Sequence, residues 1–125
     1  MPAPTKPDIA AEFVMRLLVA GDHAHIHHLK TRSYAQHMAL GSFYEEIEEL
    51  ADSLAESLQG KVGILDYPAD LQVPLASTPL KFLRELDAYI QDKRSGLSTE
   101  SDIQNQIDDI VTLVSQTYYK IETLS

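Results

Sequence analysis

The sequence contains no cysteine and no tryptophan, and it has no long uninterrupted run of apolar residues. Without cysteine there are neither disulfides nor thiolate ligands, so zinc-finger and iron–sulfur sites are excluded and any metal must be bound through nitrogen and oxygen. No run approaches the roughly 18 apolar residues that a membrane span needs. The N-terminal MPAPTKPD also lacks the apolar core of a signal peptide. We therefore expect a cytoplasmic protein that does not enter a membrane.

Basic residues are scarce, since 10 Lys and Arg stand against 19 Asp and Glu and give a formal net charge of −9. They are scattered along the chain, and the N-terminal segment before Asp8 holds only Lys6. A chain of this charge repels phosphate backbones at long range, so direct DNA binding is not expected. The acidic surplus fits the handling of cations, and it also fits simple solubility.

The 125 residues, 44 % of them hydrophobic, suffice for one domain over residues 1–125 and are too few for two. Apolar residues recur at helical intervals and predict an all-α fold. The predicted helices cover residues 8–29, 33–59, 79–94 and 99–123. Their end signals are Asp8 for the first, Ser33 and Gly60 for the second, Thr78, Pro79 and Gly96 for the third, and Ser98 or Thr99 for the fourth.

The segment between the second and third helices, KVGILDYPADLQVPLAS, contains three Gly or Pro residues and cannot be one helix. It reaches up to about 60 Å when extended, which exceeds the roughly 42 Å length of the second helix. A crossover at this point is typical of ferritin-like four-helix bundles, whereas an up-down-up-down bundle needs only short connections. We expect the ferritin-like bundle with a long crossover, and the up-down bundle is the alternative.

All five histidines lie in HAHIHHLKTRSYAQH, residues 23–37. On a helical projection His28 falls on the face that also carries the core residues. His25 falls on a neighbouring apolar strip, and a second strip on a small bundle indicates contact with a partner subunit. His23 and His27 lie away from both faces, so we expect them to be exposed to solvent.

One edge of the second helix carries a histidine and several carboxylates: His37, Glu45, Glu48, Asp52 and Glu56. This edge is either a solvated acidic surface or part of a metal site. Asp52 and Glu56, at i and i+4, can bind one ion, but His37 is about 22 Å from Asp52 along the helix. If two copies cross antiparallel about a two-fold axis, His37 of one chain approaches Asp52 and Glu56 of the other. Counted from Thr31, His25 and His37 are equally far from the turn, so we expect them at the same height.

These residues resemble the ferroxidase signature of Dps-type mini-ferritins, and HMALGSFYEEIEELADSLAESLQG is similar to that family's second helix. The resemblance covers about residues 20–60. It implies that His25, His37, Asp52 and Glu56 bind the metal, with His28 competing with His25 for the role on the first helix. It implies a homo-oligomer, at least a two-fold dimer and in its full form a twelve-subunit shell, which oxidises Fe(II) with O₂ or peroxide for iron storage or detoxification. Iron is the expected metal, and zinc and manganese are alternatives for the same donor set.

The chain departs from mini-ferritins because it is shorter and lacks both the lysine-rich tail and the tryptophan near the site. It also resembles small phage-encoded ferritin-like proteins in IQNQIDDIV and TYYK, which implies the host cytoplasm as its location. The alternative function is a non-catalytic helical interaction or structural protein, for example in a phage particle. A dimer that loosens in acid is a further alternative, because clustered histidines gain charge near pH 6.5. Di-iron oxygenase chemistry is not expected, since the second and fourth helices lack Glu-x-x-His.

Overall fold

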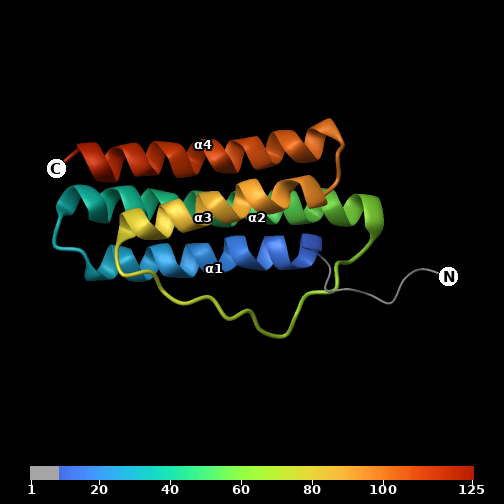
Figure 1. Ribbon diagram of the computed structural model, residues 1–125, viewed down its shortest axis with the longest axis horizontal. Helices are drawn as coiled ribbons and strands as arrows, with labels where there is room; N and C mark the ends of the chain where they lie inside the picture. The colour runs from blue at the N-terminus through green and yellow to red at the C-terminus, as the bar shows by residue number, and fades with distance from the viewer. Residues whose placement is uncertain (1–8) are drawn as a thin grey trace.

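The structure, a computed structural model, describes residues 9–125 and is built from α-helices (Figure 1). The helices are α1 (Ile9–Lys30), α2 (Tyr34–Val62), α3 (Pro79–Lys93) and α4 (Ser101–Thr123), with a short 3-10 helix, η1 (Arg94–Gly96), after α3. No strand occurs among the described residues, so the predicted all-α class is confirmed. None of these helices is long and apolar enough to cross a membrane. Asp8, which we expected to open the first helix, lies outside the described residues.

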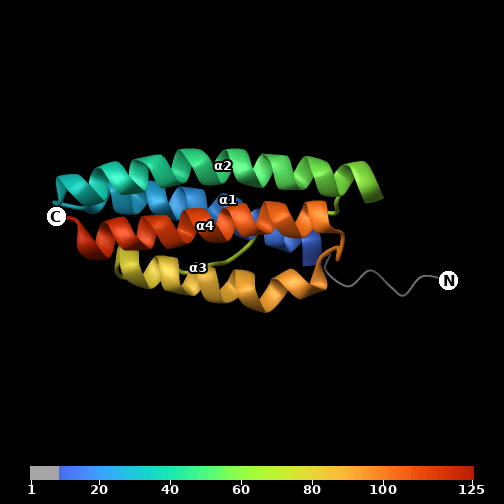
Figure 2. The same ribbon diagram turned by 90° about the horizontal axis from the view of Figure 1, so that it is seen from above.

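The helices α1 to α4 pack side by side in a bundle (Figures 1 and 2). α1 packs mainly on α2 and α3, and α4 packs on the same two helices, so α1 and α4 lie on one diagonal of the bundle. In Figure 1, α1 and α4 run in one direction and α2 and α3 run in the other. Because α2 and α3 are consecutive and parallel, the chain must return along the bundle between them.

The connection of residues 63–78 makes that return along the outside of the bundle (Figure 1). It is attached to the bundle where the side chains of Leu65 and Ala76 are buried. It reaches α3 at the end of the bundle that also holds the α1–α2 turn and the C-terminus. One end of the molecule therefore gathers the last turn of α1 and the first turns of α2 and α3.

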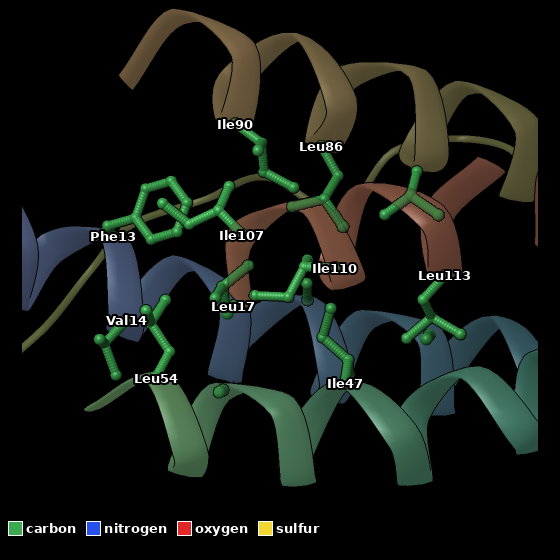
Figure 3. Packing of buried hydrophobic residues seen from close by; sticks show 14 of the residues in the cluster. Phe13, Val14, Leu17, Ile47, Leu54, Leu86, Ile90, Ile107, Ile110 and Leu113 are labelled. Atoms are coloured by element: carbon green, nitrogen blue, oxygen red, sulfur yellow. The ribbon is translucent and has the colours of Figure 1, made fainter. Parts of the chain in front are cut away.

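The interior is a single apolar core to which each of the four helices contributes (Figure 3). Side chains with at most 1 % exposure meet there, two from each helix: Phe13, Leu17, Ile47, Leu54, Leu86, Ile90, Ile107 and Ile110. Burial of one such side chain contributes roughly 1.5–3 kcal/mol. The buried residues of α1 and α4 recur at helical intervals, as the apolar periodicity predicts, whereas three apolar residues at the edge of these stripes are less buried: Ile9 is 48 % exposed, and Val111 and Tyr118 are half-buried.

Two of the predicted helix starts are confirmed by their capping hydrogen bonds. The Ser33 hydroxyl accepts a hydrogen bond from the Gln36 N–H at 3.2 Å, and the Thr78 hydroxyl accepts one from the Lys81 N–H at 3.1 Å. Each bond satisfies a backbone N–H that has no partner within its helix. These caps fix where the chain turns into α2 and into α3.

Other predicted helix ends were misplaced by a few residues. α2 continues through Gly60 to Val62, and the left-handed residue that ends it is Gly63, with φ of 88° and its N–H donating to the Gln59 carbonyl at 2.9 Å. A glycine in a helix need not end it, because only a positive φ favours glycine. α4 begins at Ser101, after a turn in which the Ser98 hydroxyl accepts from the Glu100 N–H, so neither Ser98 nor Thr99 is its N-cap.

Candidate metal centre

His28 of α1 and His37 of α2 form reciprocal hydrogen bonds across the α1–α2 turn. His28 Nδ1 lies 2.6 Å from the His37 carbonyl oxygen, and His37 Nδ1 lies 3.0 Å from the His28 carbonyl oxygen. The two rings stack with centroids 3.7 Å apart and an interplanar angle of 19°. Because a carbonyl only accepts hydrogen bonds, each Nδ1 carries the proton and donates it. In the neutral rings, the Nε2 atoms are therefore the nitrogens that offer a lone pair to a metal.

His25 and Tyr44 extend this pair to a cluster of four rings from α1 and α2. The His25 ring stacks on the Tyr44 ring at 4.2 Å with an interplanar angle of 10°. The His28 ring meets both edge-on, at 5.9 Å from His25 and 5.4 Å from Tyr44. His25 is exposed, whereas His28, His37 and Tyr44 are half-buried. The sequence reasoning missed Tyr44, although it lies two helical turns after His37 and so faces the same side of α2.

Gly41 of α2 makes room for the His28 ring. A Cβ atom at this position would lie 3.2 Å from His28 Cε1 and 3.3 Å from His28 Nδ1. Glycine inside a helix lowers stability by about 1 kcal/mol relative to alanine. The space that Gly41 leaves for the His28 ring offsets this cost. A glycine in the middle of the predicted second helix was the available signal for close approach of another side chain.

The expectation that His25 stands level with His37 is wrong, because His37 stacks on His28. The turn comprises residues 31–33 and is centred on Arg32, one residue later than assumed, so the position across from His37 is nearer to His28 than to His25. In addition, helical side chains lean toward the N-terminus of their own helix. His28 therefore leans away from the turn and His37 leans toward it, and the two rings meet.

The carboxylates that we expected to complete the site lie further along α2. Asp52 and Glu56 are both exposed, and Asp52 lines an open hollow of about 310 Å³ with Glu45, Glu48 and Glu49. Within residues 9–125, no three His, Asp or Glu side chains converge on a common point. The structure of one chain thus brings the three histidines at positions 25, 28 and 37 into one cluster and leaves Asp52 and Glu56 apart from them.

His27 was expected to face solvent, and this is wrong, because it is only 3 % exposed. Its ring centroid lies 5.7 Å from that of Phe82 in α3, and the half-buried His23 ring lies 6.3 Å from the same side chain. Burial lowers the pKa of His27, the charge of Lys30 lowers it further, and a hydrogen bond with the Ala76 backbone opposes both effects. Burial likewise lowers the pKa of His23. A projection of α1 alone could not show that α3 and the connection cover this side.

Comparison with known proteins places the chain among its relatives. Residues 28–121 match the model of a protein family described as "Family of unknown function (DUF5856)". The chain belongs to this family. It is also similar to a protein of Enterobacteria phage T4 described as "Uncharacterized 14.6 kDa protein in mobD-ri intergenic region", with 32 % identity over 117 residues that cover 91 % of this chain and 88 % of the relative. No solved structure gives a significant match.

The DUF5856 match begins at His28, three residues after His25. It contains the whole of α2, and with it His37, Tyr44 and both carboxylates. The DUF5856 region therefore includes both partners of the stacked pair, while His25 lies just before it.

Proposed function

We propose that two copies of this chain bind and oxidise Fe(II) at sites that they form together, as in Dps-type mini-ferritins, for iron storage or detoxification. The observation that carries the proposal is the reciprocal bonding of His28 and His37, which leaves His37 Nε2 available. Metal-binding histidines usually donate their second ring N–H to a carbonyl or carboxylate in this way. Asp52 and Glu56 follow on the same helix at the mini-ferritin spacing.

The donor set supports this choice of substrate. Two imidazoles and two carboxylates suit Fe(II), and carboxylate oxygens also retain Fe(III) once it has formed. Asp52 and Glu56 make no ion pair or side-chain hydrogen bond with other residues of the described chain, so neither has to give up a partner in order to bind. The hollow lined by Glu45, Glu48 and Glu49 beside Asp52 would attract cations toward this stretch of α2.

A second copy is required because the two halves of the donor set are too far apart in one chain. His37 and Asp52 are separated by fifteen residues of continuous helix, or about 22 Å. An antiparallel crossing of two α2 helices about a two-fold axis brings the histidines of each chain to the carboxylates of the other and creates two equal sites. The single long crossover between α2 and α3 supports a ferritin-like arrangement of the bundle.

We assign the ligand from α1 to His25 and a positioning role to His28. His25 is exposed, and neither of its ring nitrogens has a hydrogen bond within residues 9–125, so both nitrogens are accessible to a metal ion at the proposed contact. His28 is half-buried beneath the backbone of Gly41, and its hydrogen bond to the His37 carbonyl fixes the start of α2. The His28 carbonyl accepts the bond from His37 Nδ1 and so selects the tautomer of His37, and the stacked His28 ring orients the His37 ring.

Calorimetric titration of the metal-free protein with Fe(II) under anaerobic conditions tests the proposal. We expect saturable binding, and we expect a His37→Ala, Asp52→Ala double variant to lose at least about a hundredfold in affinity. A His23→Ala, Asp109→Ala variant removes the same two residue types elsewhere and should bind like the wild type. Unchanged affinity in the first variant would contradict the proposal. Oxidation is then followed as Fe(III) absorbance after addition of peroxide.

A non-catalytic interaction protein is the second candidate. The observation that favours it is a hollow of about 310 Å³ between the start of α2 and the end of α4, flanked by the exposed side chains of Tyr34, Met38 and Leu124. Exposed apolar surface of this kind marks binding sites for macromolecules. This candidate predicts a chain that takes up no Fe(II) and has no ferroxidase activity in the same titration.

A further inference from the structure

A recessed groove runs between α3 and α4, two helices that pack on each other (Figures 1 and 2). Its lining comes from residues 83–91 of α3 and residues 111–118 of α4. None of these residues belongs to the histidine cluster or to the proposed metal site. The volume of this α3–α4 groove is about 670 Å³. Sites for small molecules usually measure about 300–1,000 Å³, so the groove has the size of such a site.

The floor of the α3–α4 groove is apolar and lies below the outer surface of the two helices. Leu83, Val111 and Val114 form it, and Leu83 and Val114 are at most 3 % exposed. Across the described residues 79–93 of α3, no large apolar side chain is exposed. A partner protein would therefore find none to bury on this helix, although apolar side chains form the centre of most protein interfaces. The recessed floor suits a small apolar group better than a protein surface.

Two charged side chains border the groove without a charged partner. Arg84 reaches toward α4, where its Nη1 donates a hydrogen bond to the Tyr118 hydroxyl at 3.2 Å. The half-buried Asp87 carboxylate accepts a hydrogen bond from Gln91 Nε2 at 3.4 Å. Neither Arg84 nor Asp87 forms an ion pair with another residue of the described range 9–125. The groove thus presents one unpaired positive charge and one unpaired negative charge beside its apolar floor.

These two charges select among small molecules. A guanidinium group binds a carboxylate through two parallel N–H donors, and a carboxylate accepts hydrogen bonds from an ammonium group. A ligand that is only an anion would meet the Asp87 carboxylate and the net charge of −9 of the chain, which repels anions. A ligand that is only a cation would leave Arg84 unpaired. A molecule with both groups pairs both side chains and carries no net charge.

We propose that the α3–α4 groove binds a small zwitterion with an aliphatic side chain, either a free aliphatic amino acid or a short aliphatic peptide with free ends. Arg84 binds the carboxylate, Asp87 binds the ammonium group, and the aliphatic side chain lies on the apolar floor. The hydrogen bond to Tyr118 holds the Arg84 guanidinium beside α4. The site is independent of the metal centre proposed above, because it uses none of the residues at positions 25, 28, 37, 52 and 56.

Titration of the full chain with leucine and with leucyl-leucine, followed by ¹H–¹⁵N NMR at about pH 7, tests the proposal, because both ends of these ligands are then mainly charged. We expect saturable shifts in the backbone signals of residues 83–91 and 111–118. Isocaproate lacks only the amino group of leucine, and isoamylamine lacks only its carboxylate. Each should bind at least about fivefold more weakly than leucine. Tighter binding of the dipeptide assigns the groove to peptides, and tighter binding of leucine assigns it to the free amino acid.

Removal of either charge tests the groups that hold the ligand. Arg84→Gln and Asp87→Asn should each weaken binding of the tighter ligand about fivefold, which is the upper range for ion pairs at a protein surface. Arg32→Gln and Asp109→Asn remove the same charges at exposed positions outside the groove and should leave the affinity unchanged. Wild-type affinity in Arg84→Gln and Asp87→Asn would contradict the proposal.

Ser115→Phe tests the place of binding, because Ser115 is an exposed residue of the lining and a phenyl ring at this position occupies the groove. This variant should lose the saturable shifts while its NMR spectrum still shows a folded chain. Gln116→Phe introduces the same ring at the next position, which is exposed and does not line the groove, and should bind like the wild type.

Three results would overturn the proposal: no saturable binding of leucine or leucyl-leucine, full binding by Ser115→Phe, and binding of isocaproate or isoamylamine as tight as that of leucine. Native mass spectrometry of the same variants separates a small ligand from another occupant. If Ser115→Phe binds no ligand but changes the oligomeric state relative to the wild type and Gln116→Phe, and the wild type binds no zwitterion, a second copy covers the groove and the proposal is wrong.

Discussion

At the scale of single residues, the defining feature is the pair His28 and His37, in which each ring is tied to the backbone of the other. In water the neutral imidazole exchanges freely between its two tautomers, but a carbonyl acceptor at Nδ1 selects one of them. This selection needs no metal, because both acceptors are backbone carbonyls of the chain itself. In the metal site proposed above, the pair would therefore be prepared to bind through Nε2 without a change of tautomer.

This preparation predicts a spectroscopic result for the metal-free protein. In ¹⁵N NMR at about pH 8, where ordinary histidines are neutral, His28 and His37 should both show a protonated Nδ1 and an unprotonated Nε2. The exposed His25 serves as the internal control, because no hydrogen bond selects its tautomer. A protonated Nε2 on His28 or His37 would show that the reciprocal bonds do not form.

Two glycines of α2 allow a matched comparison of stability. A Cβ at Gly60 would contact nothing within 4 Å, so Gly60→Ala should raise the free energy of unfolding by about 0.5–1 kcal/mol. A Cβ at Gly41 would press on the His28 ring, so Gly41→Ala should gain less or lose stability and should shift the NMR signals of His28 and His37. Denaturant unfolding of both variants measures the difference, and equal stabilisation without a shift of those signals would contradict it.

At the scale of the elements, the helices could be predicted from apolar periodicity and from side-chain caps such as Ser33 and Thr78. What could not be predicted depends on neighbours far away in the sequence. The burial of His27 depends on Phe82 of α3, which lies more than fifty residues later. Which histidine stacks on His37 depends on where the α1–α2 turn is centred and on the direction in which helical side chains lean. Because the turn is centred one residue later than we assumed, the ring that stacks on His37 is that of His28 and not that of His25.

The contact between α1 and α3 gives a prediction about pH. Tyr89 of α3 stacks on Phe13 at 5.9 Å, with Arg16 4.8 Å from its ring centre. Burial, together with the charge of Glu12, raises the pKa of Tyr89 from 10.0 to about 12. Because the pKa is higher in the folded protein than in the unfolded chain, the neutral phenol of Tyr89 contributes fully to the free energy of unfolding below pH 10.0. This contribution is lost as the pH rises through about 12.

Between about pH 9 and about pH 11, the free energy of unfolding should therefore fall less in Tyr89→Phe than in the wild type, because phenylalanine cannot ionise. Denaturant unfolding at the two pH values measures the difference. Tyr119→Phe is the matched control, because this tyrosine of α4 is 56 % exposed and should behave like the wild type. If all three proteins lost stability equally, the phenol of Tyr89 would not be protected by the α1–α3 contact.

At the scale of the whole molecule, one bundle leaves apolar side chains uncovered on the side of α1 that carries His25. Leu18 is 39 % exposed and Leu29 is 66 % exposed, and both lie at whole helical turns from His25. Val14, which lies on the same side of α1 three helical turns before His25, is 2 % exposed and belongs to the core of its own chain. The remaining strip is short, which fits a contact centred on the histidine cluster.

Leu29→Glu should consequently convert the assembled protein to monomers and remove Fe(II) binding at the same time, because the proposed site needs both copies. Native mass spectrometry at several concentrations measures the first effect, and calorimetry measures the second. Ile64→Glu introduces the same charge at a residue that is 89 % exposed on the connection and should change neither. Monomers that still bound Fe(II) with full affinity would place the site within a single chain.

The most direct test mixes two inactive variants, one carrying His25→Ala and His37→Ala and the other carrying Asp52→Ala and Glu56→Ala. A mixed dimer has one site in which both histidines and both carboxylates are intact and one site in which all four ligands are missing. If ligands come from two chains, each variant alone binds no Fe(II), and the equilibrated equal mixture regains about a quarter of the wild-type sites. If the mixture regains no binding, the site is not shared between subunits.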